Sequence, residues 1–258
     1  MSEKKYRGYM IDLDGTMYRG KEPIPAAKKF IKSLQAQNIP FLFVTNNSTR
    51  TPQKIVENLA NNFDIHVSTA NVYTSALATA DYLADLDPDK RQVYVIGELG
   101  LKLALLNRGF QFNEDDPDYV VMGLDYDLTY HKLELATLAV RKGAKLIGTN
   151  PDSNLPSEHG MIPSTGALVA SVEYATQQKA VFVGKPETII MEKALKKLGL
   201  NKDEVVMVGD NYNTDIMAGI NFGIDTLIVY TGLSTPTDIA KTKRKPTHAV
   251  SSLTDWKI

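Results

Sequence analysis

The sequence contains no cysteine. That absence excludes a disulfide framework, a cysteine nucleophile and metal sites built from thiolates. No run of apolar residues is long enough to cross a bilayer. The formal net charge of -1 leaves no basic excess of the kind that nucleic-acid binding requires. No apolar signal core precedes the first charged motif in "MSEKKYRGYMIDLDG". We therefore expect a soluble, cytoplasmic protein that binds neither nucleic acid nor membranes.

Two residue patterns alternate along the chain. Of its 258 residues 43% are hydrophobic, which is enough for a core in one large domain or two smaller ones. Short apolar runs predict strands, and amphipathic runs with capping residues predict helices. The strands are expected within 8–14, 39–47, 91–97, 118–125, 144–150, 180–185, 204–210 and 225–232. The helices are expected within 24–38, 51–63, 68–87, 98–109, 130–143, 164–179, 186–199 and 213–223. This alternation predicts an α/β fold with parallel sheets.

Polar and charged residues stand where four of the predicted strands end. In open parallel sheets, ligands bind outside the carboxyl ends of the strands. The residues at these ends are Asp12 and Asp14, Thr45 and Asn46, Lys185, and Asp210. Because they share this position despite their separation in sequence, we expect them to form one site.

Asp12 and Asp14 are two residues apart at the end of an apolar run. If strand geometry persists, both carboxylates point to the same side of the strand. The alternative is a surface turn, since Asp-Gly is common in turns. A buried carboxylate pair needs a cation, a shared proton or both. Beside Mg²⁺, one carboxylate can act as a nucleophile while the other acts first as general acid and then as general base.

Asp210 follows a second apolar strand. Mg²⁺ prefers such hard oxygen ligands and shares them with phosphate oxygens. Asp215 lies five residues further on and could bind the ion through water or contact its ligands from outside. The alternative is an ordinary acidic residue at a helix N-terminus, where the helix dipole favours it.

Lys185 stands in "VFVGKPE". The Gly-Lys pair does not fit a phosphate-binding P-loop, because no glycine stands five residues before Gly184 and Pro186 replaces the required Ser or Thr. We expect Lys185 to act as a point charge facing the carboxylates and an incoming phosphoryl group. The alternative is a surface lysine at the start of a helix, although the helix dipole disfavours that position.

Thr45 and Asn46 end the run "FLFVTNN" and offer a hydroxyl, an amide and backbone N–H groups to a phosphate. Asn47 and Ser48 could orient the same loop. These residue types also cap helices and form turns, which is the alternative for all four.

The charges of the expected site favour one protonated group. Three ionised aspartates and a phosphate dianion carry more negative charge than Mg²⁺ and Lys185 can neutralise. A protonated Asp14 beside an ionised Asp12 reduces the excess, and backbone N–H groups can offset the rest. This balance predicts that activity requires a divalent cation.

Four ordered motifs resemble those of the haloacid dehalogenase-like (HAD) phosphohydrolases. They are "DLDGT" at 12–16, "VTNN" at 44–47, "GKP" at 184–186 and "VGDNYNTD" at 208–215. The stretches "DGTMYRG", "TNNSTR", "GTNPD" and "VFVGKP" further resemble the NagD / 4-nitrophenylphosphatase subfamily. The resemblance implies a Rossmann-like parallel-sheet core, residues 1–80 and 181–258, interrupted by an inserted α/β cap at 81–180.

The resemblance also implies roles for the residues at the strand ends. Asp12 would be the nucleophile that forms an aspartyl-phosphate, and Asp14 would protonate the leaving group and later activate water. Mg²⁺ would be bound by the Asp12 carboxylate, the Asp14 backbone carbonyl and Asp210. Lys185 would hold the nucleophile and the transferred group.

Further residues of the expected site bind phosphate or support the metal ligands. The phosphate would be held by Thr45 and Asn46, with Asn47 beside them. Asp215 and Asn211 are expected to contact the metal-binding residues from outside.

The predicted function is an Mg²⁺-dependent phosphatase acting on a small phosphorylated metabolite. A phosphotransferase or mutase would use the same aspartyl-phosphate but shield it from water. A non-catalytic sensor of phosphorylated ligands would need no general acid. The loop "GTNPDSNLPSEHG" at 148–160 offers Asn150, Asp152 and His159 to a substrate, although Asn-Pro-Asp is also a turn signal and His159 is more simply solvent-facing. An exposed cap face could support a homodimer.

Overall fold

The computed structural model describes residues 4–258, which form two compact units. The first unit contains residues 4–45, 52–73 and 185–258, and the second contains residues 46–51 and 74–184. The second unit is therefore longer than the segment 81–180 expected from the sequence. Residues 46–51 join it, and so does the whole of helix α3 (Ser75–Leu86), which packs on helix α4 (Leu99–Leu106) of the same unit.

A six-stranded sheet forms the centre of the first unit. Its strands lie in the order β15 (His248–Val250), β14 (Asp225–Val229), β13 (Val205–Gly209), β1 (Gly8–Ile11), β4 (Phe41–Thr45) and β5 (Val72–Thr74). The strands from β15 to β4 are parallel. In the register, Ile11 lies beside both Phe43 and Val208. Asp12 and Asp210 therefore follow neighbouring strands at the same edge of the sheet.

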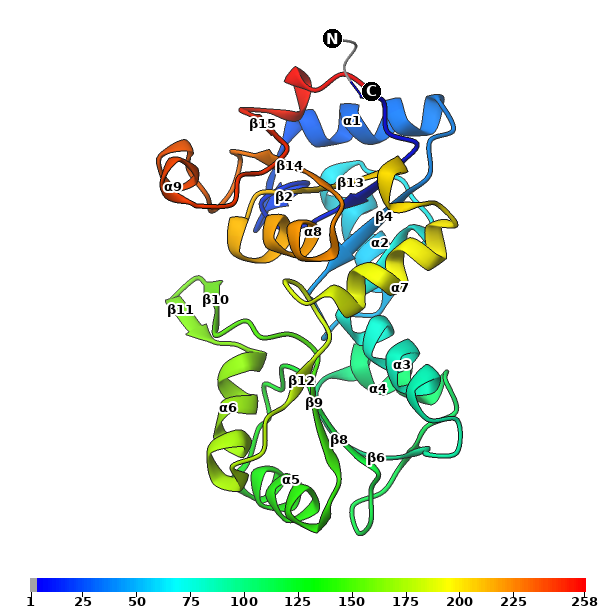
Figure 1. The fold of residues 1–258 in the computed structure, drawn as a ribbon, viewed down its shortest axis with the longest axis vertical. Coiled ribbons are helices and arrows are strands. Elements are labelled where there is room, and N and C mark those ends of the chain that lie inside the picture. Colours follow the sequence, from blue (N-terminus) through cyan, green and yellow to red (C-terminus); the bar gives the residue numbers. More distant parts are fainter. Residues whose placement is uncertain (1–3) are drawn as a thin grey trace. The chain divides into compact units, whose positions relative to one another are not determined.

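Helices cover both faces of this sheet, because successive side chains along each strand point to opposite faces and apolar side chains lie on both. Buried side chains of α1 (Pro25–Ala36) and α2 (Pro52–Phe63) join one apolar cluster with Tyr9, Phe43 and Val208. On the opposite face, α7 (Thr188–Leu198) contacts β4, and α8 (Met217–Phe222) contacts β14 (Figure 1). A short helix, α9 (Pro236–Lys241), follows β14.

The helix predicted to begin at Ser68 or Thr69 is wrong in its first part. A capping box between Ser68 and Asn71 closes a single 3-10 turn, Thr69–Asn71. The residues that follow, Val72–Thr74, form the edge strand β5. Helix α3 begins only after Thr74, whose hydroxyl accepts a hydrogen bond from the Leu77 N–H group. Local capping thus ended the pattern that had suggested one continuous helix.

Besides β5 and α9, three short strands of the first unit were absent from the expected elements. They are the antiparallel hairpin of β2 (Tyr18–Arg19) and β3 (Glu22–Pro23), and the edge strand β15. Each has two or three residues, which is too short for a hydrophobic period to be read from sequence.

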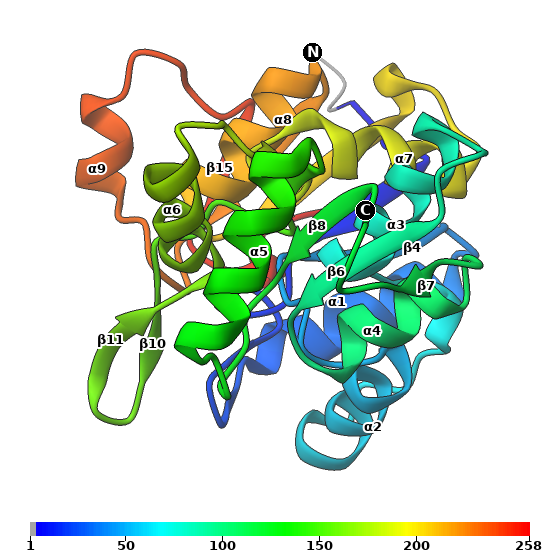
Figure 2. The ribbon, with the colours of Figure 1, turned by 90° about the horizontal axis from the view of Figure 1, so that it is seen from below.

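The second unit has its own five-stranded parallel sheet. The strands lie in the order β12 (Val181–Phe182), β9 (Lys145–Gly148), β8 (Tyr119–Met122), β6 (Gln92–Ile96) and β7 (Gln111–Phe112). Helices α5 (Tyr130–Lys142) and α6 (Thr165–Thr176) pack on one face in a separate apolar cluster, and α3 and α4 lie on the other (Figure 2). A hairpin of β10 (Asn154–Ser157) and β11 (Gly160–Pro163) projects from this unit. The predicted α/β fold with a parallel-sheet core and a second α/β unit is confirmed.

Within residues 4–258, no helix combines the length and the apolar character needed to span a membrane.

Candidate active site

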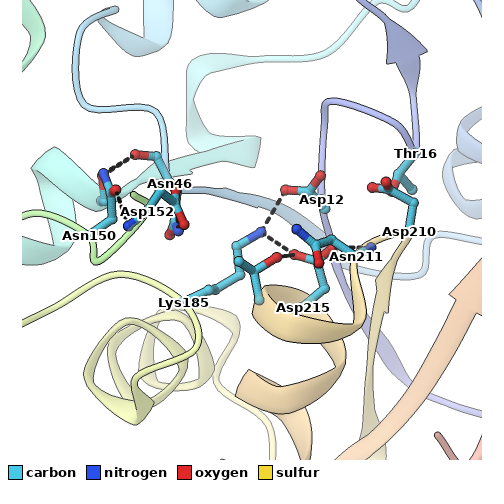
Figure 3. Close-up of polar contacts among 11 residues, drawn as sticks. Asp12, Thr16, Asn46, Asn150, Asp152, Lys185, Asp210, Asn211 and Asp215 are labelled. Atoms are coloured by element: carbon cyan, nitrogen blue, oxygen red, sulfur yellow. Dashed lines mark hydrogen bonds and ion pairs between the residues drawn. The ribbon is translucent and has the colours of Figure 1, made fainter. Parts of the chain in front are cut away.

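Lys185 lies buried between two carboxylates of the first unit. Its ammonium group donates to Asp12 Oδ1 at 2.6 Å and to Asp215 Oδ1 at 2.7 Å (Figure 3). The residue is 1% exposed, and Asp215 is equally buried. A buried lysine with two carboxylate partners is not a surface residue at a helix start, so the structure argues against that alternative.

The sheet positions the first of these carboxylates. Asp12 follows β1, and its N–H group donates to the carbonyl of Val208 on the neighbouring strand at 2.9 Å. The ladder therefore extends one residue beyond the strand and holds the Asp12 backbone beside the end of β13. The Asp12 side chain is mostly buried, at 13% exposed.

Asp210, directly after β13, is held at both carboxylate oxygens. Oδ2 accepts from the Leu233 N–H group at 2.8 Å, and Oδ1 accepts from the Thr16 hydroxyl at 3.3 Å. Gly15 and Gly232 approach this carboxylate so closely that a Cβ atom at either position would overlap it. Gly15 also has a φ of +88°, which disfavours any side chain there.

Asp215 lies in a short π-helical turn, Tyr212–Ile216. Its N–H group donates to the Asn211 carbonyl at 2.9 Å, and its Oδ2 accepts from the Asn211 N–H group at 3.1 Å. A Cβ atom at Gly209 would overlap the Asp215 side chain. Asn211 thus orients Asp215, and Asp215 itself contacts Lys185 directly, which is more than the outer contact expected from the sequence.

Burial and like charges shift the pKa values of these groups. Burial, followed by the Asp215 charge, raises the pKa of Asp12 well above its usual range, while Lys185 lowers it. Burial and Asp215 likewise raise the pKa of Asp210 to about 6. Burial alone would lower the pKa of Lys185, but the charges of Asp12 and Asp215 outweigh it and raise that pKa. Three carboxylates around one ammonium group leave negative charge that a further cation can neutralise.

The same three carboxylates could hold a metal ion. Asp12, Asp210 and Asp215 each offer one oxygen, and these oxygens lie within 4.8 Å of one another. An all-carboxylate set of hard oxygen donors fits Mg²⁺. The sequence predicted Asp12 and Asp210 as ligands and placed Asp215 outside them; the Asp14 backbone carbonyl as a further ligand stays a prediction.

The Asp14 side chain lies in a different environment from that of Asp12. Strand β1 ends at Ile11, so the strand alternation that would place both carboxylates on one side does not extend to Asp14. Asp14 is exposed, and its Oδ1 accepts from the Gly20 N–H group at 3.4 Å. A buried carboxylate paired with a lysine and an exposed carboxylate lie in different environments, which suits different chemical roles.

The residues expected to bind phosphate fall in both units. Thr45 is the buried last residue of β4 in the first unit. In the second unit, the Asn46 carbonyl accepts from Ser75 Oγ at 2.7 Å and Asn150 Nδ2 at 3.0 Å, and Asn46 Nδ2 donates to Asp152 Oδ2 at 3.0 Å (Figure 3).

The next residue of this loop also makes local contacts. Asn47 Oδ1 accepts from the N–H groups of Thr49 and Arg50 at 3.0 Å each. The phosphate-binding role of Thr45, Asn46 and Asn47 stays a prediction.

One segment of the site was not identified from the sequence. The loop at 230–234 follows β14 and supplies Leu233 and Gly232 to the surroundings of Asp210. A signal was present: "YTGLS" stands at the end of a predicted strand, and the same strand-end criterion selected the other site residues. None of its side chains is ionisable except that of Tyr230, so charge alone did not mark it.

Comparisons with known proteins identify the family. A model described as "Haloacid dehalogenase-like hydrolase" matches residues 9–111, and one for HAD-hydrolase-like proteins matches residues 182–256. The chain is 47% identical over 253 residues to the 5'-nucleotidase YutF of Bacillus subtilis, covering 98% of each chain. It is 52% identical over 253 residues to an acid sugar phosphatase of Staphylococcus epidermidis, covering 97% of this chain and 96% of that protein.

A solved structure agrees with these relatives over almost the whole fold. A mutant of the thermostable NPPase from Geobacillus stearothermophilus is 54% identical, with a TM-score of 0.93 over 98% of this chain and 99% of that one. Relatives this similar, matched along nearly their full lengths, show the family of this chain. The chain therefore belongs to the haloacid dehalogenase-like hydrolases, among the phosphatases of the NagD / 4-nitrophenylphosphatase-like subfamily.

Proposed function

We propose that this protein is an Mg²⁺-dependent phosphomonoesterase that hydrolyses a small phosphorylated metabolite through an aspartyl-phosphate. The observation that carries the proposal is the contact of Lys185 with Asp12 at 2.6 Å inside a buried group of three carboxylates. This contact orients the carboxylate and favours its ionised form, against the burial that favours its protonated form. An ionised, oriented carboxylate is a nucleophile.

The first half of the reaction transfers the phosphoryl group to Asp12. A carboxylate oxygen of Asp12 attacks phosphorus, and the bond between phosphorus and the ester oxygen breaks. Asp14 gives its proton to that oxygen, which leaves as an alcohol. Lys185 stabilises the negative charge on the phosphoryl oxygens because its ammonium group already lies at the nucleophile.

The second half returns the enzyme to its starting state. Asp14, now ionised, takes a proton from a water molecule, and the resulting hydroxide attacks phosphorus. The bond between phosphorus and Asp12 breaks, which releases inorganic phosphate and regenerates the carboxylate. The exposure of Asp14 fits this exchange of protons with a leaving group and with water.

Asp12, Asp210 and Asp215, or the backbone carbonyl of Asp14, would hold the magnesium ion. When bound, Mg²⁺ neutralises charge on the phosphate oxygens. Thr45, Asn46 and Asn47 would hold the remaining phosphate oxygens through hydroxyl, amide and backbone N–H groups.

The names of two relatives indicate a class of substrate. One is named a 5'-nucleotidase and another an acid sugar phosphatase, and both names denote small phosphate esters. We therefore propose a phosphorylated metabolite of this size. The homodimer remains a prediction, which sedimentation of the purified protein would check.

The proposal is tested by phosphate release from a panel of phosphate esters, including 4-nitrophenyl phosphate, with Mg²⁺ and with a chelator. Asp12→Asn should lower kcat by roughly 10⁴-fold with an unchanged far-UV spectrum, because it removes the nucleophile. Acid quenching during turnover should trap phosphate covalently on the wild type and not on this variant. Asp64→Asn, at an exposed position in the same unit, is the matched control and should retain full activity.

Two results would contradict this proposal. Wild-type activity in Asp12→Asn would exclude Asp12 as the nucleophile. Binding of phosphate esters by the wild-type protein without phosphate release would indicate a sensor.

A further inference from the structure

The loop at 230–234 joins separate parts of the first unit. Its members contact the turn after Asp14, the hairpin β2–β3 and the metal-binding candidate Asp210. None of them was assigned a role above. The question is whether these contacts only stabilise the fold or also position the reacting groups.

Thr231 contacts the turn that carries Asp14. Its hydroxyl donates to the Gly15 carbonyl at 2.7 Å. The Gly15 N–H group donates to the Tyr18 carbonyl at 2.6 Å. Both polar groups of Gly15 are therefore fixed, one by the hairpin and the other by Thr231. Since Gly15 can adopt many backbone conformations, an external hydrogen bond has a large influence on which one is populated.

The same loop holds Asp210. The Leu233 N–H group donates to Asp210 Oδ2 at 2.8 Å, and the Ser234 N–H group donates to the Asp210 carbonyl at 3.1 Å. Thr16, the residue after Gly15, donates to the other carboxylate oxygen of Asp210. These contacts close a ring. Thr16 bonds to Asp210, Asp210 bonds to Leu233, the loop leads from Leu233 to Thr231, and Thr231 bonds back to Gly15.

Arg19 holds this loop from the hairpin side. Its Nε donates to the Thr231 carbonyl at 3.1 Å, and a terminal guanidinium nitrogen donates to the same oxygen. Gly20, next to Arg19, donates to the Asp14 carboxylate. The hairpin therefore contacts Asp14 and Thr231 through adjacent residues.

We propose that Thr231 is a positioning residue for the general acid. Its hydroxyl fixes the Gly15 peptide, and thereby holds the Asp14 turn at a set place relative to Asp210. This inference rests on the proposed function, because it takes Asp14 as the proton donor. It assigns no contact between Thr231 and substrate.

A positioning role differs from a purely structural one in its dependence on the leaving group. 4-Nitrophenolate leaves without needing a proton, whereas the alkoxide of a sugar phosphate needs one. Displacing Asp14 should therefore slow phosphoryl transfer from the sugar phosphate and leave transfer from 4-nitrophenyl phosphate nearly unaffected, whereas the later hydrolysis of the aspartyl-phosphate would be slowed equally for both. Loss of folded protein would reduce both rates equally.

The test compares kcat/KM for 4-nitrophenyl phosphate with kcat/KM for a sugar phosphate that the wild type hydrolyses, under saturating Mg²⁺, because kcat/KM reports the transfer step and not the later hydrolysis of the aspartyl-phosphate. Thr231→Val removes the hydroxyl at nearly constant shape and should lower the sugar phosphate rate about tenfold relative to the nitrophenyl ester. Thr231→Ser keeps the hydroxyl and should restore the wild-type ratio. Thr242→Val, which removes a similar hydroxyl-to-carbonyl bond at the end of α9, should leave the ratio unchanged.

Amide hydrogen exchange gives a readout that does not depend on activity. Thr231→Val should increase exchange at residues 15–18, because the Gly15 peptide loses its outer support. If the wild type hydrolyses no phosphate ester, the proposed function fails and the general-acid part of the inference fails with it, and this measurement then decides only whether Thr231 fixes the Gly15 turn.

An unchanged kcat/KM ratio in Thr231→Val, or unchanged exchange at 15–18, would overturn the proposal. If Thr231→Val does not fold, Arg19→Met weakens the same loop from an exposed position. It should shift the ratio in the same direction, and a wild-type ratio in that variant would equally overturn it.

Discussion

At the scale of single residues, Lys185 is surrounded by negative charge and shielded from solvent, so its loss should affect stability as well as activity. Lys185→Met keeps the length of the side chain but leaves Asp12 and Asp215 without their shared cation. We expect the free energy of unfolding to fall by about 3–5 kcal/mol, the usual cost of an uncompensated buried charge. Urea unfolding at neutral pH without divalent cations measures this loss.

The double variant Lys185→Met with Asp215→Asn separates this charge effect from simple loss of packing. Removing one of the two orphaned carboxylates should recover part of the lost stability, so the two substitutions should not add. Additivity of the single effects to within about 0.5 kcal/mol would mean that the two side chains do not interact in solution.

Membership of the site could be predicted from the sequence most directly where the residue is charged. Asp12, Lys185 and Asp210 were identified because a charge at the end of an apolar strand needs an explanation. The direct contact of Asp215 with Lys185 was not, since a helical period places residue 215 near the site but does not orient its carboxylate. Thr231 was not predicted for another reason. It is uncharged, and its proposed role depends on the carbonyl of Gly15, 216 residues earlier in the chain.

At the scale of secondary-structure elements, an ion pair joins the start of α5 to the end of β8 in the second unit. Lys132 donates to Asp125 Oδ2 at 2.8 Å and to the Asp127 carbonyl at 2.9 Å, while the Asp125 side chain is only 3% exposed. Lys132→Met should lower the free energy of unfolding by about 3 kcal/mol, because Asp125 would stay buried without a counter-charge. Thermal or urea unfolding of the variant measures this change.

Lys179→Met is the matched control for this element. Lys179 pairs with Glu173 at 3.4 Å but is 89% exposed, so its removal should change stability little. Equal losses in the two variants would show that burial of Asp125 does not set the strength of its ion pair.

The long elements could be predicted because their periods are clear. Local sequence alone predicts strands from the apolar runs of β1, β4, β13 and β14. It likewise predicts helices from the spaced apolar positions of α1 and α2. The short elements depend on partners remote in sequence: β5 and β15 exist because a longer strand offers them hydrogen bonds. No local pattern of three residues contains that information.

At the scale of the whole molecule, the first unit is closed by contacts between the two ends of the described chain. The Tyr6 hydroxyl donates to Asp225 Oδ2 at 2.9 Å and lies 2.7 Å from His248 Nε2. The Tyr6 ring stacks on Trp256. Lys4 donates to the same Asp225 oxygen at 2.6 Å. Burial would raise the pKa of Asp225, but the hydrogen bonds from Lys4 and Tyr6 outweigh it and lower that pKa.

This shift predicts a pH-dependent contribution to stability. A carboxyl group whose pKa is lower in the folded state stabilises the fold above its unfolded pKa and loses that contribution as the pH falls through the folded one. Asp225→Asn should therefore cost about 1–2 kcal/mol at neutral pH. The difference from wild type should shrink as the pH falls below 3.8, the ordinary value for this group.

Urea midpoints between pH 3 and pH 7 measure this difference. A difference between Asp225→Asn and wild type that stays constant down to the lowest pH would refute the assigned pKa direction.

The sheet order of the first unit has a consequence for biosynthesis. Strand β1 takes its place between β4 and β13, and β13 is made some two hundred residues later. A nascent chain leaving the ribosome can complete the second unit while the apolar β1 segment still lacks one of its two neighbours. In the cell, the second unit should then fold before the first. Strand β1, which is made before the other strands of its sheet, should be accessible to chaperones for the longest time.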